Sequence, residues 1–187
     1  MMNRKPYVQL NQVVLDKQKT CIHKKTKMYI KNNILANKEY TDQNKIDEIL
    51  SIGNYKNDKI ICMFNVFYKC VKNNNISLIR QIINYYKKNE TILDFIVNSY
   101  YSSGKTKYTP LMCAAYYGNI DIVKLLMENG ADINVINDYN ENIIEMTQIG
   151  LKNHIKKNPT NSTALITQYN IVIDYLTEII KKSIKYD

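Results

Sequence analysis

The segment 108–134, YTPLMCAAYYGNIDIVKLLMENGADIN, limits most strongly what this chain can fold into. Two short apolar runs with helical spacing are separated by Gly118, and Gly130 follows the second run. Thr109 and Pro110 precede the first run, and these residue types favour a helix cap and a first helical turn. Glycine after each run is typical of a helix that ends in a left-handed conformation. The segment therefore predicts two short helices joined by a tight turn, in which most residues serve folding.

The pattern of this segment returns, less clearly, on both sides. Residues 75–82 align with residues 119–126 when the sequence is shifted by 44 positions, and a fainter copy aligns at a shift of 33. The later copy holds about 17 extra residues within 149–168, and about 11 extra residues lie around 90–107. Internal repeats of this length indicate a solenoid of stacked helices.

We expect an all-α fold with short hairpins, built as a solenoid of about three repeats at about 60–90, 108–140 and 141–182. The first and last copies are degenerate, as terminal repeats must present a polar outer face. Residues 1–59 are predicted to form a basic N-terminal arm and a helical cap, and 60–187 the repeat domain.

Apolar spacing predicts further helices before the clear repeat. In the cap they are expected over 26–38 and 41–50, whereas 8–15 fits a strand or a loose helical turn. Two more are predicted over 60–72 and 76–88, separated by three consecutive asparagines. The first of these two is apolar around much of its circumference, which favours an inner, sandwiched position.

The sequence TPLMCAAYYGNIDIVKLLMENGADIN resembles the ankyrin-repeat pattern TPLHxAAxxGHxxIVxxLLxxGADxN almost position by position. Met112 and Asn119 stand where the pattern has histidine, and the match extends over Thr109–Asn142, roughly a fifth of the chain. Asn140 stands where ankyrin hairpins usually carry glycine, and asparagine tolerates positive φ. The resemblance implies a stack of helix pairs joined by hairpins, without catalysis.

The resemblance also implies that the protein binds other proteins, as an adaptor, inhibitor or effector, through its hairpin tips and the exposed side of the inner helices. Tyrosine offers a large, fairly rigid contact area with a polar tip. Alternatively, some of the 16 tyrosines of this chain are exposed here without a function. Carried over one by one, the partner-binding positions are Tyr108, Tyr116, Tyr117, Ile136, Asp138, Tyr139 and Glu141.

Charge is unevenly distributed along the chain, whose net charge is +9. Residues 108–147 carry Lys124 against six carboxylates, and the acidic groups Asp138, Glu141 and Glu145 favour a partner with a basic patch. We expect alanine at Tyr116, Tyr117 and Tyr139 together to abolish partner capture with little change in thermal stability.

The basic arm supports an alternative function from another class, that of a nucleic-acid-associated protein. Residues 1–31 carry eight Lys or Arg against a single Asp. A solvated lysine-rich extension is the simpler interpretation of the same residues. The candidate phosphate contacts are Arg4, Lys5, Lys24, Lys25 and Lys27.

Asn134 has a second interpretation through the family resemblance. With Leu126, Asp132 and Ile133 it matches a spacing that looks like the asparaginyl-hydroxylase target of many ankyrin repeats. The simpler interpretation is a hairpin asparagine that bonds its own backbone.

Catalytic, metal and cofactor motifs are not evident in the sequence. The four cysteines form no CxxC pair and there are two histidines, so we expect buried reduced thiols, no zinc site and no cofactor. His154 falls in the polar, basic 149–168 insertion, which predicts a solvated loop. The triplet Gly104-Lys105-Thr106 resembles a phosphate loop only superficially, because the upstream glycine is missing. We expect no enzyme activity.

Targeting signals are also not evident. The sequence shows neither a signal-like apolar start nor a run of roughly 20 apolar residues, so we expect a soluble, monomeric protein of the cytoplasm or the nucleus. Its bias toward Ile, Asn, Lys and Tyr is typical of AT-rich genomes, which makes a viral or pathogen origin a hypothesis.

Overall fold

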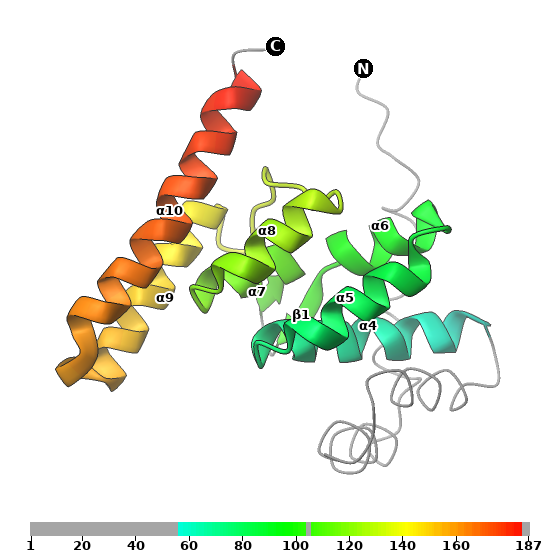
Figure 1. The fold of residues 1–187 in the computed structure, drawn as a ribbon, viewed down its shortest axis with the longest axis horizontal. Helices are drawn as coiled ribbons and strands as arrows, with labels where there is room; N and C mark the ends of the chain where they lie inside the picture. Colours follow the sequence, from blue (N-terminus) through cyan, green and yellow to red (C-terminus); the bar gives the residue numbers. More distant parts are fainter. Residues whose placement is uncertain (1–55, 104–105, 185–187) are drawn as a thin grey trace.

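The structure is a computed structural model that describes residues 56–103 and 106–184 as a stack of helices with one small hairpin (Figure 1). This confirms the predicted all-α solenoid. The basic arm and the cap helices predicted before residue 51 lie outside the described residues. The elements are, in chain order, α4 (Lys56–Lys72), α5 (Ile76–Tyr86), α6 (Glu90–Asn98), β1 (Tyr101–Ser103), β2 (Thr106–Tyr108), α7 (Pro110–Tyr116), α8 (Ile120–Glu128), α9 (Ile143–Lys157), a short 3-10 helix η2 (Pro159–Asn161) and α10 (Ser162–Ile184).

The helix pairs α4–α5 and α7–α8 form where apolar spacing predicts them. The three asparagines end α4 and start α5: Asn74 takes a positive φ of 57°, and Asn75 caps α5 by accepting a hydrogen bond from the Leu78 N–H at 3.2 Å. Thr109 caps α7 in the same way, with its hydroxyl 3.2 Å from the Met112 nitrogen. Gly118, at φ 68°, ends α7 and lets the chain turn into α8.

The insertion at 90–107 is a folded element that sequence reasoning missed. Asn89 caps α6, and β1 then pairs with β2 in antiparallel register, Tyr101 opposite Tyr108. Asn98 connects the end of α6 to the next repeat, since its amide donates to the Gly130 carbonyl and its oxygen accepts from the Asp132 N–H. The insertion therefore becomes part of the stack.

The insertion at 149–168 corrects a second expectation. Instead of forming a solvated loop, it lengthens α9 to Lys157 and starts α10 at Ser162, with Pro159 in the short turn between them. α10 lies along α9 at one end of the stack (Figure 1). The helices continue because their inner sides stay apolar, with Tyr169 and Val172 of α10 fully buried.

One apolar core runs through the stack from α4 to α10. The two cysteines whose side chains are described, Cys70 and Cys113, are buried free thiols within it, as predicted. Cys21 lies outside the described residues, and so does the side chain of Cys62. Of the helices in the described ranges, none combines the length and the apolar character needed to cross a membrane. Residues 56–103 and 106–184 also contain no group of three His, Cys, Asp or Glu placed to hold a metal ion.

Candidate partner-binding groove

A groove of about 500 Å³ opens between α4, α7 and α9, the first helices of the three predicted pairs, and reaches Tyr101 and Tyr108 of the β1–β2 hairpin and the 137–141 loop. We call it the tyrosine groove. Its volume falls in the range typical of ligand sites. Tyrosine dominates its lining, with Tyr68, Tyr101, Tyr108, Tyr116, Tyr117 and Tyr139. The remaining lining residues are Lys69, Lys72, Cys113, Glu141, Met146, Ile149 and Asn153.

The groove brings together five of the seven predicted partner-binding residues, namely Tyr108, Tyr116, Tyr117, Tyr139 and Glu141. The other two, Ile136 and Asp138, do not line it. Sequence reasoning missed Tyr68 and Tyr101, which come from α4 and from the 90–107 insertion. Both elements fall outside the clear repeat, so the only feature of the sequence that could have indicated these two residues is the high tyrosine content of the chain.

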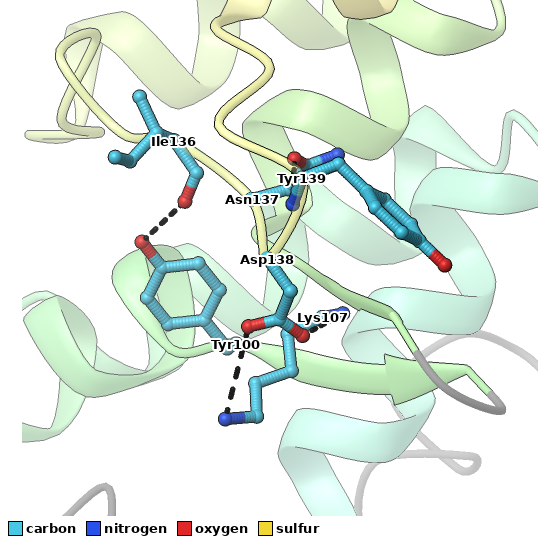
Figure 2. A network of polar contacts seen from close by, with 6 residues as sticks. All are labelled: Tyr100, Lys107, Ile136, Asn137, Asp138 and Tyr139. Atoms are coloured by element: carbon cyan, nitrogen blue, oxygen red, sulfur yellow. Dashed lines mark hydrogen bonds and ion pairs between the residues drawn. The ribbon is translucent and has the colours of Figure 1, made fainter.

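Asp138 and Ile136 belong instead to a network that joins their loop to Tyr100, just before β1, and to Lys107 in β2 (Figure 2). The Asp138 carboxylate accepts a hydrogen bond from the Lys107 N–H at 3.2 Å and lies 4.0 Å from the Lys107 Nζ. The Ile136 carbonyl accepts from the Tyr100 hydroxyl at 3.1 Å. Figure 2 shows the Tyr139 ring and the Ile136 side chain directed to opposite sides of the loop. Asp138 therefore connects its own loop to β2.

Asn137 holds the loop that presents Tyr139, a role that sequence reasoning did not find. Its side chain is 5 % exposed, and its oxygen accepts hydrogen bonds from the Tyr139 N–H at 2.9 Å and the Glu141 N–H at 3.0 Å. Its amide donates to the Glu141 Oε2 at 2.5 Å. Asn140 completes the turn at φ 58°, the positive angle expected from its place in the repeat. Tyr139 is 63 % exposed on this fixed loop.

The α9 wall of the groove is held by His154, which corrects its predicted place in a loop. His154 lies half-buried on α9, and its ring contacts the rings of Tyr116 and Tyr117 with centroids 5.9 and 5.7 Å away. Its Nδ1 lies 2.8 Å from the Gly150 carbonyl and 2.7 Å from the Tyr169 hydroxyl, which itself donates to the Tyr116 carbonyl at 2.7 Å. Because the carbonyl of Gly150 can only accept, we assign the proton to Nδ1.

The floor of the groove combines aromatic stacking with a buried thiol. Tyr68 and Tyr101 stack with ring centroids 4.0 Å apart. Burial and the hydrogen bond to Cys113 raise the pKa of Tyr68 far above its usual value. Burial also raises the pKa of the Cys113 thiol to about 11, although the bond from Tyr68 and the charge of Lys72 act in the other direction. Both groups therefore remain protonated and neutral near pH 7.

The remaining predicted site residues lie outside the groove. Asn134 is exposed beyond α8, and its backbone N–H donates to the Asp132 carboxylate at 2.9 Å. Its hydroxylation stays a prediction. The candidate phosphate contacts Arg4, Lys5, Lys24, Lys25 and Lys27 lie outside the described residues.

Comparisons with known proteins agree with this architecture. Residues 34–137, more than half of the chain, match the family model described as ankyrin repeats (3 copies). The match ends before α9, so the predicted third repeat at 141–182 lies beyond it. The human oxysterol-binding protein-related protein 1 is 34 % identical over 67 residues, which are 36 % of this chain and only 7 % of that protein. No solved structure matches.

Ankyrin repeats are protein–protein interaction modules that are generally non-catalytic. The helix pairs, the hairpin tips and a family match over most of the described repeats point to the same assignment. The chain therefore belongs to the ankyrin-repeat family.

Proposed function

We propose that this chain is a non-catalytic adaptor, inhibitor or effector that binds a partner protein in the tyrosine groove. The observation that carries the proposal is the convergence of six tyrosines from α4, the β1–β2 hairpin, α7 and the 137–141 loop on one groove of about 500 Å³. Aromatic side chains in a concave surface are typical of the positions that dominate protein–protein affinity.

The tyrosines of the groove are already oriented before a partner arrives. Tyr116 and Tyr117 meet edge to face with centroids 5.2 Å apart, and the Tyr116 hydroxyl accepts a hydrogen bond from Asn153 at 3.1 Å. Side chains that are fixed in the free protein lose little conformational entropy on binding. This arrangement supports a groove that binds its partner without rearranging.

The charge of the loop beside the groove supports a partner with a basic patch. Glu141 lines the groove, and Glu145 lies exposed one helical turn further on. Complementary charge speeds association and selects among partners. We place this interaction in the cytoplasm or the nucleus, with the chain acting as a monomer.

Partner capture by the purified chain tests the proposal. Wild type, Tyr139→Ala and the control Tyr85→Ala are each immobilised, and the captured proteins are quantified by mass spectrometry. Tyr85 is a matched control because it is 51 % exposed on α5, outside the groove. We expect Tyr139→Ala to weaken binding roughly thirtyfold, as loss of a hot-spot residue does. Equal capture by wild type and Tyr139→Ala would refute the assignment of the groove.

Tyr116 and Tyr117 are less suitable for this test than the sequence indicated. Both are half-buried against His154, so alanine at either position removes packing as well as contact area. We therefore expect the triple variant with Tyr139→Ala to lower the melting temperature too, contrary to the expectation from the sequence.

The nucleic-acid alternative rests on the basic arm alone. Binding of the full chain to DNA or RNA should then fall steeply as salt rises, because each phosphate contact releases counterions. Gel retardation at low salt distinguishes the two functions: no retardation removes this alternative and leaves the groove proposal untouched.

A further inference from the structure

The charges that line the tyrosine groove are separated by sign. Lys69 and Lys72 lie in the last turn of α4, and Glu141 directly precedes the cap of α9. α7 packs against both α4 and α9, so it lies between the elements that carry the two kinds of charge, and Tyr116 at its end and its C-cap Tyr117 line the groove there. The groove is therefore positive on its α4 side and negative on its Glu141 side, with Tyr116 and Tyr117 between the two.

Glu141 is the carboxylate of the 138–145 segment that faces the groove. Asp138 is engaged by Lys107, and the Glu145 Oε2 accepts a hydrogen bond from the Asn142 N–H at 2.8 Å in the cap of α9. The amide of Asn137 fixes the Glu141 carboxylate without neutralising its charge. A fixed charge beside aromatic walls costs little reorganisation when a ligand of opposite charge binds.

We propose that the groove binds an extended peptide segment in one direction, with an acidic side chain at the Lys72 end and a basic side chain at the Glu141 end. Apolar or aromatic residues of the segment lie between them, over the tyrosines. This inference rests on the proposed function and adds the order of charges to it. A small anion would pair only with the lysines, whereas a peptide of this composition pairs with the lysines and with Glu141 and also packs on the tyrosines.

Selection from a displayed library of random dodecapeptides on the full chain tests the inference. We expect the enriched peptides to share an acidic and a basic residue on opposite sides of an aromatic or aliphatic pair. Selection on Lys72→Glu should remove the acidic residue from the consensus. Selection on Glu141→Gln, which keeps a hydrogen-bond acceptor for Asn137, should remove the basic one.

One enriched peptide, synthesised with a fluorescent label, then gives the size of each effect by anisotropy. We expect Lys72→Met and Glu141→Gln each to weaken binding roughly five- to tenfold, as a partly exposed charge pair does. Lys88→Met is the matched control, because Lys88 is exposed beyond α5 and does not line the groove. A peptide whose acidic residue is replaced by lysine should bind Lys72→Glu more tightly than wild type.

The outcomes separate this inference from the function on which it rests. Enriched peptides without the charge order, whose binding Tyr139→Ala still abolishes, would overturn the direction and leave the groove in place. Peptides that bind Tyr139→Ala as well as wild type would overturn the groove itself. Failure to enrich any peptide on the wild type would contradict binding of an extended segment.

Discussion

The pairs α7–α8 and α9–α10 share the order of helix, turn and helix but differ in length. The first pair has 7 and 9 residues, and the second has 15 and 23. The shorter pair follows the repeat pattern closely, and the longer one contains the insertion. The added residues of the longer pair supply His154 and Asn153, which hold Tyr116 in the wall of the groove. The irregular repeat thus shapes the surface that the regular repeat presents.

A glycine near the same place in each first helix serves a different purpose. Gly118 takes a positive φ of 68° and ends α7. Gly150 lies inside α9, where an added Cβ would stand 2.0 Å from the Tyr116 carbonyl oxygen of α7. The first glycine is needed for a turn and the second for the close approach of two backbones, because α9 crosses the end of α7 at that point.

Among variants that test how the pairs α7–α8 and α9–α10 pack together, Gly150→Ala should change the stability most. Alanine in a helix normally stabilises by about 1 kcal/mol over glycine, but here the new methyl group would displace backbone. We therefore expect the free energy of unfolding to fall by about 3 kcal/mol, as it does when a core is severely overpacked. Urea unfolding followed by circular dichroism measures it. Gln148→Ala, on an exposed site of the same helix, serves as the control, and a stabilised Gly150→Ala would contradict the close crossing.

Tyr169→Phe tests the contact between the long pair and the short one. The variant keeps the ring, which is fully buried, and removes the hydroxyl shared by the Tyr116 carbonyl and His154. We expect the free energy of unfolding to fall by about 2 kcal/mol, because the partly buried Tyr116 carbonyl loses its hydrogen-bond donor. Tyr175→Phe is the matched control on α10, since Tyr175 contacts Lys124 through its ring face at 5.6 Å. Equal melting temperatures for the two variants would show that the hydroxyl network is unimportant.

The smallest expected difference in stability is between variants of the N-caps of α7 and α9. Thr109 caps α7 from a position only 1 % exposed, whereas Asn142 caps α9 on the surface, in a reciprocal box with Glu145. We expect Thr109→Ala to cost about 2 kcal/mol and Asn142→Ala about 1, because water can replace only the exposed cap. Thermal unfolding compares them, and Thr109→Ser should restore most of the loss. A larger loss at Asn142 would reverse this ranking of the caps.

Local features of this fold were predictable from the sequence. Thr109 caps the helix that follows it, Gly118 ends that helix, and Asn140 takes a positive φ, all within a few residues of the motif that indicated them. Each depends on the backbone of its own turn, so the residue type alone contains the information.

Features that depend on distant partners could not be predicted. Asp138 was predicted as a partner contact, and that role stays a prediction, but its contact with Lys107, 31 residues earlier, was not indicated by the sequence. His154 was expected in a loop, but Tyr169 and the rings of α7 hold it on a helix. In both contacts one of the two partners, Lys107 or His154, lies in an insertion, where the repeat pattern does not indicate which residues will meet.

The sequence by itself determined the family, the helix pairs and most of the tyrosines that line the groove, because helical periodicity and caps are encoded locally. The tertiary structure decided which of these side chains meet. It brought Tyr68 and Tyr101 to the groove, joined Asp138 to Lys107 of β2, and placed Lys72 and Glu141 in the groove on elements that lie on either side of α7. The reason is that stacking joins residues from separate repeats, and the insertions set how closely those repeats approach.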